Sequence, residues 1–119
     1  MININYRDPR PIYEQVKDSF RQLIISGALP ADSKMPSVRE LASGLTINPN
    51  TIQRAYRELE AEGYICSVPG RGSFVCQQDA AIDARRAELL KNFDALTAEL
   101  ALVGIDREQL AERLRAEND

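Results

Sequence analysis

Two short helices with clear start and stop signals, separated by a tight turn, constrain this fold more than any other feature of the sequence. Ser37 and Glu40 form a capping box at the start of the first helix, because each side chain can bond a free backbone N–H of the other residue. Asn48 is a favourable N-cap for the second helix, Pro49 suits its first position, and Gly63 ends it. Two helices this short cannot bury a core alone, so neighbouring elements must complete it.

The elements on either side of this pair complete a small domain. A longer helix with one apolar face is predicted between Pro11 and Gly27. Gly44 and Thr46 mark a four-residue turn between the two short helices. Beyond the pair, strand-forming residues flank segment 69–72, which predicts a β-hairpin with a four-residue loop. This order predicts a mostly α fold with a small β-hairpin, a winged helix-turn-helix.

The chain has two cysteines, Cys66 and Cys76, in the two predicted strands. If Val68 faces Ser73 across the hairpin, the two thiols project from opposite faces of it. We therefore expect no disulfide between them. Two cysteines do not make a zinc site, which needs four ligands. We interpret them as small apolar residues in a reducing compartment.

The composition argues against an enzyme. The 119 residues include no histidine, which is the commonest general base and metal ligand. We see no phosphate-cradling P-loop and no metal-ligand cluster, so we expect no catalytic residue, cofactor or metal. No apolar run approaches the roughly 18 residues that a membrane span requires. Without a secretory signal at the N-terminus, a cytoplasmic protein with no membrane partner is expected.

The net charge of −3 argues mildly against nucleic-acid binding, but the charge is unevenly distributed. Residues 1–78 hold nine Lys or Arg and eight Asp or Glu, a net of +1. Residues 79–119 hold six and ten, a net of −4. The binding face matters more than the total charge. Because segment 77–81 resembles a joint, we predict a DNA-binding domain over 1–78 and a helical tail over 79–119.

The helix that starts at Pro49 has a polar face suited to DNA recognition. Its apolar residues follow the spacing of one buried helical face: Ile52, Ala55, Tyr56 and Leu59. The side chains that point the other way are amides and guanidiniums: Asn50, Gln53, Arg54 and Arg57. Amides can bond N6 and N7 of adenine, and guanidiniums can bond O6 and N7 of guanine. We predict that this helix enters the major groove of double-stranded DNA.

Residues around this helix are suited to hold the phosphate backbone. Asn48 and Thr51 lie at its start, where free backbone N–H groups favour a phosphate. Ser37 and Arg39 begin the preceding helix, which crosses the backbone in this geometry. Arg71, at the tip of a glycine-flanked turn, can reach a minor groove or a phosphate.

Each of these side chains, taken alone, also suits an ordinary solvated surface. Arg57 could join a local charge network with nearby glutamates, and Arg39 could pair within its own helix. The functional interpretation depends on the caps, the turn and the basic hairpin occurring together and in this order. The alternative is a winged-helix module that docks to proteins without specific DNA binding, which the overall acidity suits.

The segments MPSVRELASGL, NPNTIQRAYRELEAEGYI and GRGSFV resemble the DNA-binding domain of the GntR family of bacterial transcription regulators. The resemblance covers about residues 10–76. It implies DNA contacts by six residues: Ser37, Arg39, Thr51, Gln53, Arg71 and Gly72. Many members carry Ser-Arg-x-Thr before the recognition helix, where the arginine reads a base; Pro49 stands in its place here and cannot make that contact. The Asn-Pro-Asn-Thr form is similar to the YtrA subfamily.

The C-terminal segment carries a narrow apolar stripe with a seven-residue pattern, typical of a helix packed along another helix. Its residues are Ile82, Leu89, Phe93, Leu96, Leu100 and Val103. The short final helix cannot cover this stripe alone, and a second copy of the chain is the simplest partner. Alternatively, the stripe folds back onto the winged domain. The resemblance to the YtrA subfamily also implies a dimerisation tail. We predict a homodimer, with the small-molecule effector unknown, that acts as a sequence-specific repressor.

Overall fold

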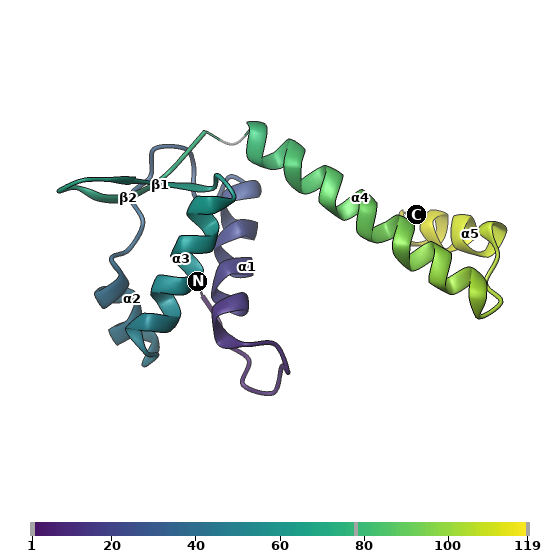
Figure 1. The fold of residues 1–119 in the computed structure, drawn as a ribbon, viewed down its shortest axis with the longest axis horizontal. Helices are drawn as coiled ribbons and strands as arrows, with labels where there is room; N and C mark the ends of the chain where they lie inside the picture. The colour runs from purple at the N-terminus through teal and green to yellow at the C-terminus, as the bar shows by residue number, and fades with distance from the viewer. Residues whose placement is uncertain (1, 78, 119) are drawn as a thin grey trace. The chain divides into compact units, whose positions relative to one another are not determined.

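The computed structural model describes residues 2–77 and 79–118 (Figure 1). In sequence order its elements are α1 (Ile12–Ile25), α2 (Val38–Leu45), α3 (Pro49–Ala61), β1 (Ile65–Val68), β2 (Gly72–Val75), α4 (Asp79–Leu102) and α5 (Arg107–Asn118). The chain divides into two compact units, Met1–Ile82 and Asp83–Asp119. Residue 78, at the predicted domain boundary, lies outside the described residues. The predicted fold class, mostly α-helical with one small hairpin, is confirmed.

Helix α3 is the central element of the first unit and packs against α1, α2 and β1 (Figure 1). Its buried residues are the four that helical spacing predicts: Ile52, Ala55, Tyr56 and Leu59. From α1, the core receives Val16, Phe20 and Ile24. The ring of Phe20 meets that of Tyr56 edge-on, with 5.8 Å between the centroids. The apolar stripe of α3 is thus enclosed, which leaves its opposite face to solvent.

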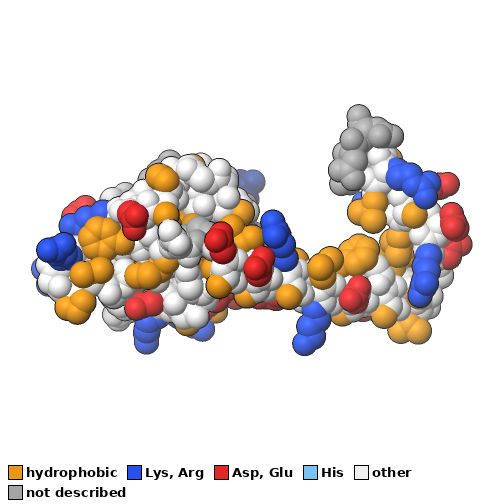
Figure 2. All heavy atoms as spheres, turned by 90° about the horizontal axis from the view of Figure 1, so that it is seen from above, with side chains coloured by type: hydrophobic (Ala, Val, Ile, Leu, Met, Phe, Trp, Pro, Cys, Tyr) orange, Lys and Arg blue, Asp and Glu red, His pale blue; other side chains and the backbone are white. Residues whose placement is uncertain are grey.

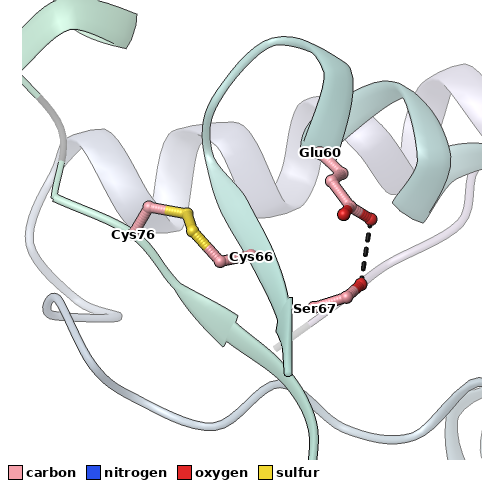
Figure 3. The surroundings of a disulfide bond; sticks show 4 residues. All are labelled: Glu60, Cys66, Ser67 and Cys76. Carbon is pink, nitrogen blue, oxygen red and sulfur yellow. Dashed lines mark hydrogen bonds between the residues drawn. A yellow bond between two sulfur atoms is a disulfide. The ribbon is translucent and has the colours of Figure 1, made fainter. Parts of the chain in front are cut away.

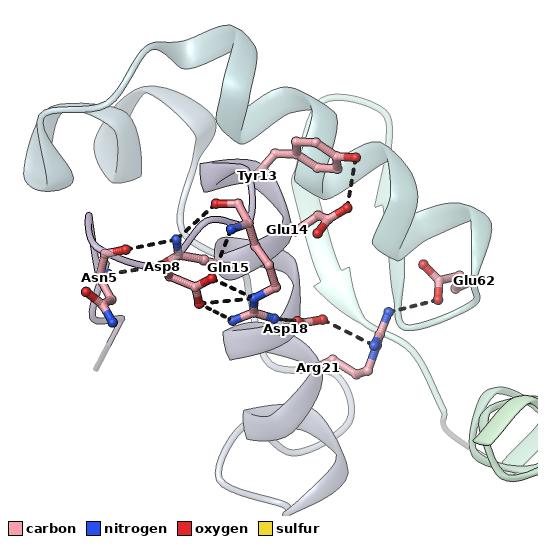
Figure 4. A network of polar contacts seen from close by, with 9 residues as sticks. Asn5, Asp8, Tyr13, Glu14, Gln15, Asp18, Arg21 and Glu62 are labelled. Carbon is pink, nitrogen blue, oxygen red and sulfur yellow. Dashed lines mark hydrogen bonds and ion pairs between the residues drawn. The ribbon is translucent and has the colours of Figure 1, made fainter. Parts of the chain in front are cut away.

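Charged side chains also join α1 to α3 (Figure 4). Arg21 is only 8% exposed, and its guanidinium lies 3.2 Å from Asp18 and 3.1 Å from Glu62. Lys17 Nζ lies 3.0 Å from a carboxylate oxygen of Glu58 and also pairs with Glu62. A buried cation is costly unless an anion compensates it. These pairs therefore favour one rotation of α3 about its axis relative to α1.

The turn between α2 and α3 is shorter than predicted. Helix α2 continues to Leu45, so Gly44 lies inside it and the turn spans three residues, 46–48. Thr46 ends α2 in the left-handed conformation, with φ 56°. Asn48 caps α3 as predicted, because its side-chain oxygen accepts the N–H of Asn50 at 2.8 Å.

The loop of the hairpin is also one residue shorter than predicted. Strands β1 and β2 pair antiparallel with Val68 opposite Gly72, so the loop comprises residues 69–71. Gly70 and Gly72 take positive φ values of 77° and 104°, a conformation that glycine adopts without steric cost. These two glycines allow the chain to reverse within a loop of three residues.

This register overturns the prediction for the two cysteines. A shift of one residue moves a side chain to the opposite face of a strand. Cys66 stands opposite Phe74, so Cys76, two residues beyond Phe74, projects from the same face as Cys66. The two form a disulfide with their Cα atoms 5.7 Å apart (Figure 3). The expectation of thiols on opposite faces was therefore wrong, because it assumed that Val68 pairs with Ser73.

The other edge of β2 is covered by residues 32–35. The N–H of Met35 donates to the carbonyl of Ser73, and that of Val75 donates to the carbonyl of Ser33, both at 2.8 Å. Lys34 and Phe74 form an isolated antiparallel bridge. The base of the hairpin is thus held on both sides by backbone hydrogen bonds.

The second unit comprises most of α4 together with α5. The cap of α5 is reciprocal, as predicted: Asp106 N–H donates to Gln109 Oε1 at 3.0 Å, and Gln109 N–H donates to Asp106 Oδ1 at 2.9 Å. The predicted joint at 77–81 differs from the structure, because α4 already begins at Asp79 and Ala81 is buried in the core of the first unit. Within the described residues, none of the helices is sufficiently long and apolar to cross a bilayer.

Candidate nucleic-acid interface

Helix α3 presents a row of polar side chains opposite its buried stripe. Asn50, Gln53, Arg54 and Arg57 are all exposed. Across the described part of the chain, the side chains of Asn50, Gln53 and Arg57 make no hydrogen bond or ion pair. The glutamates beside Arg57 have other partners: Glu58 pairs with Lys17, and Glu60 accepts the hydroxyl of Ser67 at 2.9 Å (Figure 3). The donors and acceptors of Asn50, Gln53 and Arg57 are therefore free for a ligand.

Arg54 lies on the same face but is engaged within the protein. Its guanidinium carbon lies 3.8 Å from the centroid of the Tyr13 ring, and one terminal nitrogen donates to the Tyr13 hydroxyl at 3.1 Å. Its Nε lies 3.5 Å from Glu58. A cation over an aromatic face is attracted by the ring quadrupole. Arg54 thus ties α3 to α1, and it would have to leave Tyr13 to reach a base.

The acidic residues of α3 are compensated by α1. The hydrogen bond from Lys17, supported by the pair with Arg54, holds the pKa of Glu58 below its ordinary value of 4.5. Burial lowers the pKa of Lys17, but its hydrogen bonds to Glu62 and Glu58 outweigh burial and raise the pKa overall. Lys17 and Glu58 are therefore both charged at neutral pH. Their pairing weakens the repulsion between the carboxylates of α3 and a polyanion.

The start of α2 and the hairpin border one surface hollow. Ser37, Arg71 and Gly72, three of the predicted contacts, line it together with Lys34 and Glu40. Ser37 Oγ accepts the N–H of Glu40 at 3.1 Å, which confirms its capping role. Among the residues that line the hollow, two carry positive charge and Glu40 carries negative charge. The two cations suit a phosphate at this place.

The wall of this hollow is fixed by Tyr56. Its hydroxyl donates to the carbonyl of Pro36 at 2.8 Å. Burial, assisted by the nearby carboxylate of Glu40, raises the pKa of Tyr56. The phenol therefore stays neutral and keeps its proton for Pro36. This contact links the core face of α3 to the loop that leads into α2.

Lys34 is a candidate contact that the sequence did not reveal. It is exposed, and its ammonium has no hydrogen bond or ion pair to the residues that the structure describes. A Cβ added at Gly72 would lie 3.5 Å from Cε of Lys34, so the lysine lies beside the hairpin. Its proximity to the cap residue Ser37 was visible in the sequence. Its pairing with Phe74, forty positions later, was not.

The remaining predicted contacts lie around the helix pair. Arg39 is exposed, and among the described residues it has no ion pair, so the predicted alternative of pairing within α2 does not occur. Arg39 and Pro49 border a shallow hollow beside the turn. Asn48 is exposed and Thr51 is half-buried. Since the Asn48 cap uses only its carbonyl oxygen, its NH₂ group can still donate.

The predicted apolar stripe of the tail is largely uncovered within one chain (Figure 2). Leu89, Phe93, Leu96 and Val103 are between 45% and 73% exposed. Leu100 is half-buried, and so is Ile82, which belongs to the first unit. Helix α5 faces a neighbouring side of α4, where an apolar groove is lined by Phe93, Thr97, Ala101, Ile105, Leu110 and Leu114.

In the described ranges, no cluster of three or more His, Cys, Asp or Glu side chains is placed to hold a metal ion. The exposed polar row on α3, the cationic hollow and the glycine-flanked Arg71 are instead the kinds of group that contact nucleic-acid bases and phosphates.

Comparison with known proteins identifies the architecture. Residues 12–75 match the family described as "Bacterial regulatory proteins, gntR family". The HTH-type transcriptional repressor YtrA of Bacillus subtilis is 33% identical over 117 residues, which cover 97% of this chain and 90% of that protein. A GntR family transcriptional regulator from Listeria monocytogenes superposes with a TM-score of 0.75 at 34% identity, over 92% of this chain and 96% of that one.

A further solved structure, the DNA-binding domain of AraR in complex with operator ORR3, has a TM-score of 0.55 at 31% identity and covers 62% of this chain and 89% of that one. The similarity to YtrA spans both units of the chain. The resemblance seen in the sequence is thereby confirmed: this chain belongs to the GntR family, and it is a DNA-binding transcription regulator of the YtrA type rather than an enzyme.

Proposed function

We propose that this protein is a homodimeric cytoplasmic repressor that binds a two-fold-symmetric operator. In this proposal α3 lies in the major groove, and Asn50, Gln53 and Arg57 contact base edges. One observation carries the proposal: these three side chains are exposed and free of partners in the described residues, on a helix whose opposite face is fully buried. A rigid helix with free amides and guanidiniums is suited to direct readout of a base sequence.

Phosphate contacts set the register of the protein on the duplex. Lys34, Arg39 and Arg71 are exposed and unpaired within the described residues, and two of them line the hollow beside Ser37. Such contacts determine affinity and orientation but carry no direct sequence information. The related DNA-binding domain of AraR is solved in complex with operator DNA, which supports DNA as the ligand of this domain.

The uncovered stripe on α4 supports dimerisation. A single winged domain contacts few base pairs, whereas two domains held by paired tails read two half-sites. The name of the B. subtilis relative YtrA, a repressor, supports repression as the outcome of binding.

Selection of bound sequences from a random pool of duplex DNA tests the proposal. We expect an inverted repeat whose half-sites are about one helical turn apart. Mixed-sequence DNA should retain the protein at low salt and release it as salt rises. If no DNA retains the protein at low salt, the protein is instead a protein-docking module.

Gln53→Ala tests the assignment of the reading face. The variant should lose discrimination at one position of each half-site, at a cost of about 1–3 kcal/mol per bidentate contact, and keep its preference elsewhere. Glu60→Ala is a matched control on the same helix, because Glu60 bonds Ser67 rather than facing a groove in this proposal. A selected sequence that is unchanged by Gln53→Ala would contradict the assignment.

A further inference from the structure

The hairpin that presents Arg71 also carries a disulfide on its outer face. Cys66 lies in β1 and Cys76 directly follows β2 (Figure 3). Their Cα atoms are 5.7 Å apart, within the usual range for a disulfide. They are diagonal rather than direct cross-strand neighbours, because Cys66 stands opposite Phe74. Diagonal side chains on one face of an antiparallel pair are close enough to interact.

This disulfide is not needed to build the core. The opposite face of the hairpin carries Ile65 and Val75, which pair with each other and are 2% and 1% exposed. The ladder between the strands and the hydrogen bonds from residues 32–35 hold β2 on both edges. The unit therefore has the contacts to fold with both thiols reduced. A bond on the outer face acts on the hairpin rather than on the core.

The two sulfurs are within reach of small reagents. Cys66 is exposed and Cys76 is half-buried. Both line a surface depression together with Asp32, Phe74 and Arg71. Arg71 is also the proposed DNA contact of the wing, which is the hairpin of β1 and β2 with its loop 69–71. The redox state of the cysteines therefore bears directly on that contact.

We propose that Cys66 and Cys76 form a reversible dithiol–disulfide site that sets how firmly the wing is held and thereby tunes DNA affinity. The thiolate of Cys66 attacks one sulfur of a low-molecular-weight disulfide and releases one thiolate from it. The thiolate of Cys76 then attacks the resulting mixed disulfide at Cys66 and releases the second. Two protein thiols are oxidised to one disulfide, the reagent is reduced to two thiols, and the protons pass to the released thiolates.

The effect on DNA rests on the proposed function. The disulfide closes a ring that contains the loop 69–71 and therefore Arg71. Closing this ring removes conformations of the wing that binding would otherwise have to exclude. We expect the oxidised protein to bind DNA about two- to tenfold more tightly than the reduced protein, the range set by ordering one flexible side chain.

The site itself is tested without DNA. The full chain is equilibrated in buffers of reduced and oxidised dithiothreitol at varied ratio, and free thiols are then alkylated and counted by mass spectrometry. We expect both thiols to disappear together, with a mass loss of two hydrogens, no crosslinked dimer, and full reversal by excess reduced reagent. Thiols that remain free at every ratio, or that form only bonds between chains, would overturn the proposal.

A matched variant moves one thiol to the other face of β1. Cys66→Ser combined with Ser67→Cys keeps the composition, but Ser67 pairs with Ser73 on the face away from Cys76. This variant should form no internal disulfide. Because Ser67 also bonds Glu60, Cys66→Ser alone serves as a second variant, and thermal melting of the reduced proteins checks that each one folds.

Binding to a selected duplex is then measured for each redox state. The wild-type protein should bind more tightly when oxidised, whereas both variants should bind like the reduced protein in either buffer. Equal affinity of the oxidised and reduced wild-type protein would overturn the proposal. If no state binds any duplex, the proposed function fails and the link to affinity fails with it, whereas the thiol count still decides whether the redox site exists.

Discussion

Leu96→Ala is the sharpest test of the dimer. Leu96 lies in the middle of the stripe on α4 and is 59% exposed in one chain. Complete burial of a leucine contributes about 1.5–3 kcal/mol, so covering the exposed part of this one contributes about 0.9–1.8 kcal/mol. A two-fold dimer contains the residue twice, which doubles the loss to about 1.8–3.6 kcal/mol. The dissociation constant of the dimer should therefore rise about 20- to 400-fold.

Leu102→Ala provides the control on the same helix. Leu102 is 87% exposed, more than Leu96, but it lies six residues further along α4. At about 100° per residue, the two side chains point in directions about 120° apart. If the stripe is the seam, Leu102→Ala should leave the dissociation constant nearly unchanged despite the greater exposure of Leu102.

Sedimentation velocity over a dilution series measures both variants. The expected result is a wild-type dimer that dissociates at much higher concentration after Leu96→Ala and at nearly the original concentration after Leu102→Ala. The reasoning is refuted if Leu102→Ala weakens the dimer as much as Leu96→Ala does. It is also refuted if the wild-type chain remains monomeric at every concentration, because the stripe would then have no partner.

Arg71→Ala should weaken binding to all duplexes alike and reduce the slope of log affinity against log salt by about 1, as measured by fluorescence anisotropy at several salt concentrations. Arg54→Ala and Tyr13→Ala should each destabilise the fold by about 0.5–1 kcal/mol, and a double-mutant cycle by urea unfolding should show the two changes to be non-additive. The lowered pKa of Glu58 stabilises the fold above its ordinary value of 4.5, and this contribution is lost as pH falls through the folded pKa. Glu58→Gln should therefore lose less stability than the wild type between neutral and acidic pH, as measured by thermal melting.

The helices could be predicted from the sequence because their determinants are local. Asn48, Pro49 and the apolar spacing of α3 specify where it starts and which face it buries, and the exposure of Gln53 and Arg57 follows from the same spacing. The reciprocal cap of α5 depends on two residues three positions apart. Each of these features depends on contacts within about one helical turn.

The hairpin register could not be predicted in the same way. Loops of three and of four residues both fit the turn-rich segment 69–72, and the sequence does not say which is used. The observed register pairs Ile65 with Val75 on the buried face and lets residues 32–35 bond β2. The choice is therefore made by the core and by the distant segment 32–35. A one-residue error at the loop was enough to reverse the prediction for both cysteines.

The candidate interface shows the same division between local and distant determinants. Spacing alone places Arg54 beside Gln53 and Arg57 on the exposed face, and its only local distinction is the pair with Glu58 four residues later. Its stacking on Tyr13, 41 positions earlier, does distinguish it. The helix packed against α3 thus decides which guanidinium on the exposed face of α3 is free for DNA.

Because α1 holds α3 through the contact of Tyr13 with Arg54 as well as through the pairs of Lys17 and Arg21, the reading face cannot rotate without breaking contacts between the two helices. The orientation of the three free side chains is therefore a property of the whole first unit, and the cost of disturbing it is shared between the core and these ion pairs.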